Sequence, residues 1–274
     1  MRIALVQPAS GSGQEEPRNA EQALQWLQEA ADAGAELVVF PEGYPGPINP
    51  ANSFDAFGPL CQRAAELRLH VVASRACSAR GGHGVELCVI DDRGEIAGSY
   101  LRTSPRGPYV YRDIDAWNFD YVESDTPPSV IQTRLGKIGL LVCSELYIPE
   151  LSRLLTLQGA DIIVYPAGGA INELLPGWRT LVWARAIENL VFTAACQNLY
   201  GGEEGVGTIA SPEGILAANT GEGLIVADLD LGRLRYLRET KESITFPKPY
   251  ATIPGLLEWR RPELYRALSE LSRD

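Results

Sequence analysis

The sequence predicts a layered α/β sandwich within a chain of 274 residues. Strand-type and helix-type segments alternate along most of its length, as is typical of α/β folds. Two hairpins interrupt the alternation, so a purely parallel sheet is not expected. Segments 31–41 and 157–166 also share one pattern: a helix end, small residues, an apolar run and a proline. This repeat predicts two βα halves with related geometry.

The helices are predicted from apolar residues at helical spacing. Leu24, Trp26, Leu27, Ala30 and Ala31 illustrate the pattern in the first helix, which ends at Gly34. The expected helices cover 19–33, 54–68, 149–158, 177–189, 231–239 and 262–272.

The strands are predicted from short apolar runs bounded by turn residues. Asp92-Arg93-Gly94 and Arg134-Leu135-Gly136 are turn signals that predict the two hairpins, 86–91 with 95–101 and 129–133 with 137–142. The other expected strands cover 2–7, 36–41, 70–76, 161–165, 190–196, 206–210, 214–218 and 223–228. Residues 1–243 are expected to form one domain, and residues 244–274 a C-terminal tail.

Composition excludes several classes of protein. The net charge of −11 argues against a nucleic-acid partner, which needs a basic face. No apolar run approaches the length of a membrane span, and a strand begins at once without a signal peptide. The five cysteines are odd in number and not closely spaced, which favours a reducing compartment. We therefore expect a cytoplasmic protein with no membrane association.

Metal binding has little support in the sequence. The two histidines, His70 and His83, form no ligand motif with each other or with a cysteine. A catalytic pair of cysteine and histidine is equally unsupported. We expect no metal site.

Cys143 is the strongest candidate for a catalytic residue. It follows the apolar run 138–142, and a helix is expected from about Pro149. Ligands in α/β folds bind at the carboxyl ends of strands, where such a side chain projects. A helix dipole favours a thiolate, so we expect a lowered pKa for this thiol. A free cysteine at a strand end is nevertheless more often a small buried apolar residue.

Glu42 has a comparable position at the end of an apolar run, 36–41. A carboxylate and a thiol at two strand ends indicate a general base beside a nucleophile. Taken alone, Glu42 fits a carboxylate in a surface loop equally well.

Several segments together resemble the nitrilase superfamily of carbon–nitrogen hydrolases. Glu42 and Cys143 lie in segments similar to the family's glutamate and nucleophile motifs, in the family's order. Arg102 stands where the resemblance implies a catalytic lysine. The resemblance runs from residue 2 to about 240, and the segments that carry it are 38–42, 98–102, 139–151, 159–166, 183–189 and 211–217.

The resemblance implies a four-layer αββα sandwich and a hydrolase that needs no cofactor. Its substrate would be a small amide, carbamoyl compound or nitrile, attacked by Cys143 to form a thioester. Glu42 would move the protons, and Arg102 would stabilise the developing negative charge. The resemblance also implies a homodimer or larger homo-oligomer, with the tail at the interface.

Further residues are candidates with a less defined role. The resemblance implies a second acidic residue, and the alternatives are Asp113, Asp115 and Glu123. Residues expected to contact the substrate are Trp117, Glu145, Tyr147 and Ala167.

Two other functions remain open from the sequence. One is a non-catalytic protein that binds a small amide or carboxylate, with Arg102 as a clamp. The other is an acyltransferase or esterase that uses the same thiol. All three functions place the ligand beside Cys143.

Overall fold

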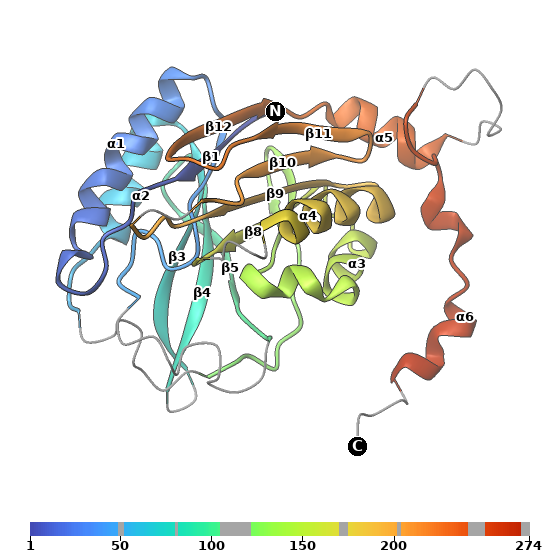
Figure 1. Cartoon of the computed structure of the whole chain (residues 1–274), viewed down its shortest axis with the longest axis horizontal. Helices are drawn as coiled ribbons and strands as arrows, with labels where there is room; N and C mark the ends of the chain where they lie inside the picture. Colours follow the sequence, from blue (N-terminus) through green and yellow to red (C-terminus); the bar gives the residue numbers. More distant parts are fainter. Residues whose placement is uncertain are drawn as a thin grey trace.

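The computed structural model describes residues 1–48, 52–79, 82–104, 122–169, 175–201, 204–240 and 250–269. Two six-stranded sheets pack face to face, and helices cover the outer side of each (Figure 1). The predicted α/β sandwich of four layers is therefore confirmed.

The first sheet has the strand order β12-β1-β2-β3-β4-β5. Strands β1, β2 and β3 run parallel, whereas β12, β4 and β5 join as antiparallel neighbours. The bounds are β1 (Arg2–Gln7), β2 (Leu37–Val39), β3 (His70–Ala79), β4 (Gly82–Ile90), β5 (Ile96–Leu101) and β12 (Gly223–Asp228).

The second sheet has the order β11-β10-β9-β8-β7-β6. Its strands β7, β8 and β9 run parallel, and β6, β10 and β11 are antiparallel. The bounds are β6 (Ile131–Thr133), β7 (Gly136–Leu140), β8 (Ile162–Ala167), β9 (Phe192–Gln197), β10 (Thr208–Ser211) and β11 (Gly214–Ala218).

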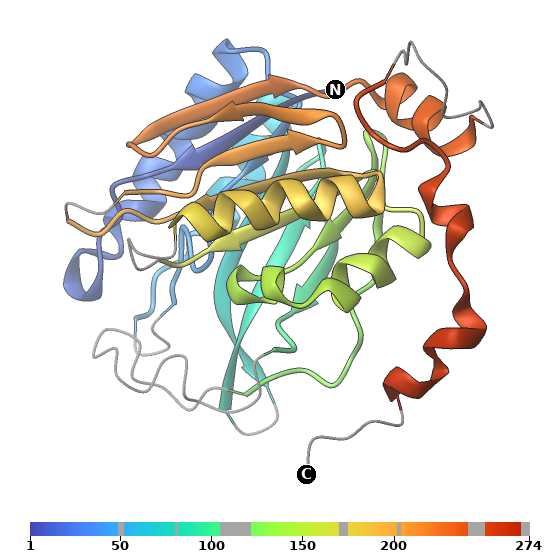
Figure 2. The ribbon, with the colours of Figure 1, turned by 45° about the vertical axis from the view of Figure 1, so that its right-hand side comes forward.

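Two pairs of helices form the outer layers (Figure 2). Helices α1 (Arg18–Asp32) and α2 (Phe57–Leu67) cover the first sheet. Helices α3 (Pro149–Leu157) and α4 (Leu175–Asn189) cover the second. A short helix, α5 (Leu231–Glu239), follows β12.

Strand β1 is apolar at successive positions because both of its faces are buried. Ile3 and Leu5 point into the core between the sheets, whereas Ala4 and Val6 contact the cluster under α1 and α2. Successive side chains of a strand alternate between faces, and here both faces are covered. A strand in this position is therefore apolar on both faces along most of its length.

The internal repeat corresponds to equivalent strands. Each sheet has a parallel triplet, β1-β2-β3 or β7-β8-β9, and the repeated segments form the middle strands β2 and β8. Glu42 follows β2 and Ala167 ends β8, so the repeat correctly paired these two strand ends.

Two predicted elements need correction. The strand expected over 86–91 begins earlier, because β4 starts at Gly82 and pairs with β3 along its length. A side chain at Gly84 would meet Leu101, because a Cβ there lies 2.6 Å from a Leu101 methyl. Gly84 therefore permits the close packing of β4 against Leu101 of β5.

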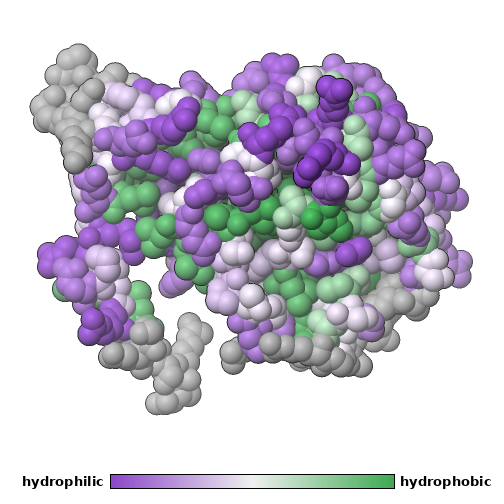
Figure 3. Space-filling model, turned by 180° about the vertical axis from the view of Figure 1, so that it is seen from behind, coloured by the Kyte–Doolittle hydropathy of each residue, from purple (hydrophilic) through white to green (hydrophobic). Residues whose placement is uncertain are grey.

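The C-terminal segment forms no continuous helix over 262–272. It contains two short 3₁₀ helices, η6 (Leu256–Trp259) and η7 (Arg266–Ser269), with the one-turn helix α6 (Pro262–Tyr265) between them. Residues 270–272 lie outside the described residues. This segment stands apart from the body and mixes apolar with polar side chains (Figure 3). The expected domain boundary at 243/244 also lies outside the described residues.

Candidate active site

Cys143 lies in a strained turn at the end of the second sheet. Strand β7 ends at Leu140, and Cys143 opens the one-turn helix η4 (Cys143–Tyr147). Its φ angle is +49°, a region that residues other than glycine seldom occupy. Such strain persists only where the surrounding structure enforces it, and it is concentrated at functional sites. Arg68 and Leu190 also have a positive φ, so this conformation supports the assignment of Cys143 only together with its sequence motif.

Glu42 is buried beside this cysteine. Its Oε1 accepts a hydrogen bond from Arg102 Nη1 at 2.7 Å, and its Oε2 accepts one from the Gly168 backbone N–H at 2.9 Å. The side chain also hydrogen-bonds the Cys143 thiol. The Glu42 carboxylate thus contacts both Cys143 and Arg102. Its third partner, Gly168, directly follows β8.

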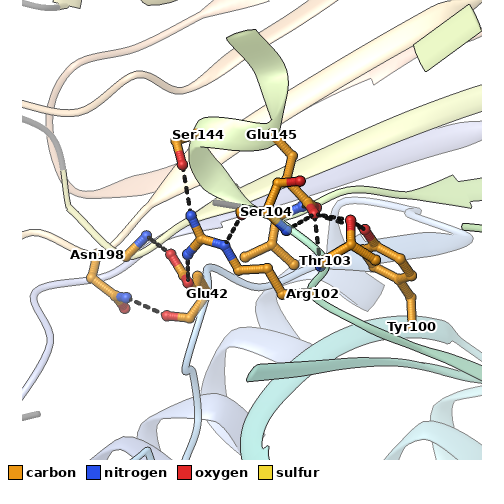
Figure 4. A network of polar contacts seen from close by, with 10 residues as sticks. Glu42, Tyr100, Arg102, Thr103, Ser104, Ser144, Glu145 and Asn198 are labelled. Atoms are coloured by element: carbon orange, nitrogen blue, oxygen red, sulfur yellow. Dashed lines mark hydrogen bonds and ion pairs between the residues drawn. The ribbon is translucent and has the colours of Figure 1, made fainter. Parts of the chain in front are cut away.

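Arg102 follows β5 and is fully buried. Each of its three nitrogens donates to the protein, as Figure 4 shows. Besides the bond to Glu42, Nε donates to the Ser104 carbonyl at 2.7 Å and Nη2 to Ser144 Oγ at 2.6 Å. The structure therefore brings Glu42, Arg102 and Cys143 together.

The expectation of a lowered thiol pKa is wrong for this structure. Burial, and then the charge of Glu42, raise the pKa of Cys143 to about 12, while Arg102 and the Gly168 N–H oppose this rise. Helix α3 begins at Pro149, as the sequence predicted, but burial and the charge of Glu42 dominate the pKa of the thiol. Attack by sulfur at neutral pH then needs a base, and Glu42 is in contact with the thiol.

The raised pKa gives a testable pH dependence. Ultraviolet absorbance of the Cys143 thiolate, taken as wild type minus Cys143→Ala, is expected to appear only as the pH rises toward 12. The Cys143 contribution to folding stability is full below the usual thiol value of 9.0 and decreases above it, because unfolding then releases a proton. A titration midpoint below pH 9 would contradict the proposed neutral resting thiol.

Among the described residues that were predicted to contact the substrate, Tyr147 is open to solvent. Its side chain is 45% exposed and meets Trp178 edge-on, with the ring centroids 5.9 Å apart. Burial, and then the nearby Cys143, raise the pKa of Tyr147. Tyr147 thus lies near the nucleophile, and Trp178 supports its ring.

Ala167 and Glu145 lie behind the reacting groups. Ala167 is fully buried in the core, and its carbonyl accepts from the Asn198 N–H at 3.3 Å. Glu145 is also fully buried, and both carboxylate oxygens accept hydrogen bonds from the protein. In this arrangement neither side chain is open to a substrate.

The remaining candidates are only partly placed. Asp113, Asp115 and Trp117 lie outside the described residues. Glu123 is half-buried, and the next residue, Ser124, donates its N–H to the Arg102 carbonyl at 2.9 Å. The choice of the second acidic residue therefore stays open.

Sequence reasoning missed Asn198, which holds Glu42 in place. Asn198 Nδ2 donates to the Glu42 carbonyl at 2.7 Å, and Asn198 Oδ1 accepts from Ser10 Oγ at 2.6 Å. Asn198 follows β9, so the strand-end reasoning applied to Glu42 and Cys143 could have identified it. The contributions of Ser144 and of the Gly168 amide had no comparable signal in the sequence.

The described part of the chain offers neither a metal centre nor a membrane anchor. Within those residues no cluster of three or more His, Cys, Asp or Glu side chains is arranged to hold a metal ion. Nor does any helix within them reach the length and apolarity that a membrane span requires.

Comparison with known proteins identifies relatives along most of the chain. The family model for carbon–nitrogen hydrolases matches residues 2–239. A deaminated glutathione amidase from Synechocystis sp. is 28% identical over 248 residues, covering 82% of this chain and 91% of the relative. Nitrilase homolog 2 from Dictyostelium discoideum is 30% identical over 270 residues, covering 89% of this chain and 78% of the relative.

Solved structures share the fold. A carbon–nitrogen hydrolase from Helicobacter pylori gives a TM-score of 0.80 at 22% identity, with 98% of both chains covered. An amidase variant from Nesterenkonia sp. gives 0.76 at 24% identity, covering 97% of this chain and 96% of the relative. In that amidase the acetamide moiety of fluoroacetamide is covalently attached to the active-site cysteine.

Proposed function

Because the chain belongs to the carbon–nitrogen hydrolase family, we propose that it hydrolyses a small amide, carbamoyl compound or nitrile through a thioester on Cys143. The observation that carries the proposal is the contact of Glu42 with both the Cys143 thiol and Arg102. A base, a nucleophile and a fixed cation are the three groups that this chemistry requires.

For an amide, Glu42 takes the thiol proton as sulfur attacks the carbonyl carbon. The carbonyl oxygen becomes negative, and Arg102 supplies the neighbouring positive charge. Glu42 then protonates the leaving amine as the carbon–nitrogen bond breaks, which leaves a thioester. Water attacks the thioester with Glu42 again as base, and the carboxylic acid and the free thiol are released.

The non-catalytic alternative receives less support from the geometry of Arg102. Its three nitrogens donate to Glu42, Ser104 and Ser144. A guanidinium that clamps a ligand carboxylate presents two parallel donors to it, whereas here Nη1 and Nη2 donate to two different protein groups, Glu42 and Ser144. The observed contacts fit a fixed cation better than a ligand clamp.

Time-resolved mass spectrometry of the intact protein tests the proposal. Acetamide, acrylamide, an N-carbamoyl amino acid and an aliphatic nitrile form the panel, and Cys143→Ala is the control. An acyl adduct on Cys143 that forms and then decays in water supports hydrolysis. Reversible binding without an adduct would contradict it, and an adduct that decays only with an added alcohol or amine would indicate an acyltransferase.

We also propose a homodimer or larger assembly, based on the exposed tail. Leu264 and Leu268 are each 64% exposed and Trp259 is 56% exposed, an arrangement that favours burial against a second copy. Light scattering at micromolar concentration is expected to give at least twice the chain mass of 29.8 kDa. A species of single-chain mass would reject the assembly.

A further inference from the structure

Five hydrogen-bond donors surround the buried carboxylate of Glu145. Its Oε1 accepts from the Tyr100 hydroxyl at 2.7 Å, and from the Thr103 N–H at 2.9 Å and hydroxyl at 2.8 Å. The same oxygen accepts from the Ser104 N–H at 3.0 Å. Its Oε2 accepts from the Val142 N–H at 2.7 Å. Both oxygens are thus committed to the protein.

These donors come from two segments at the ends of β5 and β7, which belong to different sheets. Tyr100, Thr103 and Ser104 surround Arg102 at the end of β5, in the first sheet. Val142 directly precedes Cys143, at the end of the second sheet. The Glu145 carboxylate therefore links the residues on either side of Arg102 to Val142, the residue before Cys143.

We propose that Glu145 is a positioning residue that sets the placement of Arg102 relative to Cys143. The inference rests on the proposed function, because it concerns the same reaction. Glu145 makes no contact with the substrate in this proposal, because protein donors occupy both of its carboxylate oxygens. Its effect on the reaction is transmitted through Arg102, whose distance from the reacting carbon decides how well it stabilises the negative oxygen.

The chemistry of the site requires a carboxylate rather than an amide. An ionised carboxyl group has only acceptors, and it meets five donors here. In Glu145→Gln the side-chain NH₂ must face either the Val142 N–H or the donors around Arg102. Either choice places two donors together and separates the two segments. Glu145→Gln is thus a nearly isosteric change with a specific geometric consequence.

Glu145→Gln is expected to lower kcat by roughly 10- to 100-fold with KM changed little, since small misplacements of catalytic groups cost about this much. The substrate is the panel member that the wild-type protein hydrolyses fastest. In an Arg102→Ala background the same change is expected to lower kcat by less than about threefold, because its route through Arg102 is gone. Equal losses in both backgrounds would overturn the proposal.

Alkylation of Cys143 by iodoacetamide gives a second measurement that needs no turnover. Arg102 favours the thiolate, so its displacement in Glu145→Gln should slow alkylation at a fixed pH, and Arg102→Ala should abolish the difference. If alkylation responds in this way but no panel member is hydrolysed, the proposed function fails while the role of Glu145 stands. Unchanged alkylation and unchanged kcat would refute that role.

Matched variants separate positioning from general loss of stability. Glu213, between β10 and β11, accepts from Arg233 at 2.8 and 2.7 Å and from the Ala251 N–H at 2.9 Å. Glu213→Gln should lower the Tm without lowering kcat. Where Glu145→Gln does not fold, Thr103→Val removes a single donor from the same oxygen. It should still lower kcat, and an unchanged kcat would overturn the proposal.

Discussion

Replacing Glu42 with glutamine is expected to lower kcat/KM by about 1000-fold, within the range for loss of a general base. The thiol of Cys143 has a pKa of about 12, so it is neutral at pH 7 and must lose its proton during attack. Glu42 hydrogen-bonds this thiol, and a glutamine amide cannot accept the proton. The measurement is steady-state hydrolysis of the fastest panel substrate.

Although Glu42→Gln should lower turnover, it should also lower the pKa of the Cys143 thiol. The charge of Glu42 raises the pKa of Cys143, whereas Arg102 lowers it. Without that negative charge, the thiolate absorbance is expected to appear at lower pH. Lower turnover together with a lower thiol pKa would show that Glu42 acts as the base. A residue whose function is only to favour the thiolate would instead raise the thiol pKa when it is removed.

Glu86→Gln provides a matched control in the same sheet. Glu86 accepts from Arg75 Nε at 3.1 Å, and its side chain is 18% exposed. Its replacement should leave kcat/KM and the thiolate titration unchanged. If Glu42→Gln kept more than about a tenth of the wild-type activity, Glu42 would not be the general base.

Arg102→Lys is expected to weaken turnover by roughly 1–3 kcal/mol of transition-state stabilisation. The guanidinium donates in three directions, to Glu42, Ser104 and Ser144. A single ammonium group is a point charge and does not reproduce this fork. The residue therefore fits its site as an arginine, although the family resemblance implies a lysine there. The measurement is kcat/KM for the fastest panel substrate.

Faster turnover in Arg102→Lys would mean that Arg102 stands in place of a lysine in a site that is not adapted to arginine. Arg102→Lys would then raise amide hydrolysis. Arg102→Ala serves as the reference, because it removes the cation and leaves Glu42 buried without that partner. Breaking such a buried pair is expected to lower the free energy of unfolding by about 3–5 kcal/mol, measured by urea denaturation. Turnover unaffected by either change would remove Arg102 from the mechanism.

The candidate site was found from the sequence because its residues follow strands. Cys143 and Glu42 each come after an apolar run, and strand ends of α/β folds collect functional side chains. The repeat also paired the ends of β2 and β8, where the Gly168 N–H meets Glu42. Local patterns carry this information because burial on both faces of a strand makes its sequence apolar.

The sequence was less informative about how each side chain is used. Glu145 follows Cys143 so closely that a substrate contact was expected, yet its carboxylate accepts from backbone N–H groups of the segment that follows β5. The thiol pKa was expected to fall, but burial and Glu42 raise it. Both depend on segments that are far apart in the chain.

By itself, the sequence determined the order of strands and helices, the two related halves and the residues with reactive chemistry. These follow from side-chain periodicity and turn residues, which act over a few neighbouring positions. Only the tertiary structure decided the contact between Glu42 and Arg102, the burial of Glu145 and the raised pKa of Cys143. Hydrogen bonds and electrostatic interactions depend on distance in space and on desolvation, and both are set when the two sheets pack together.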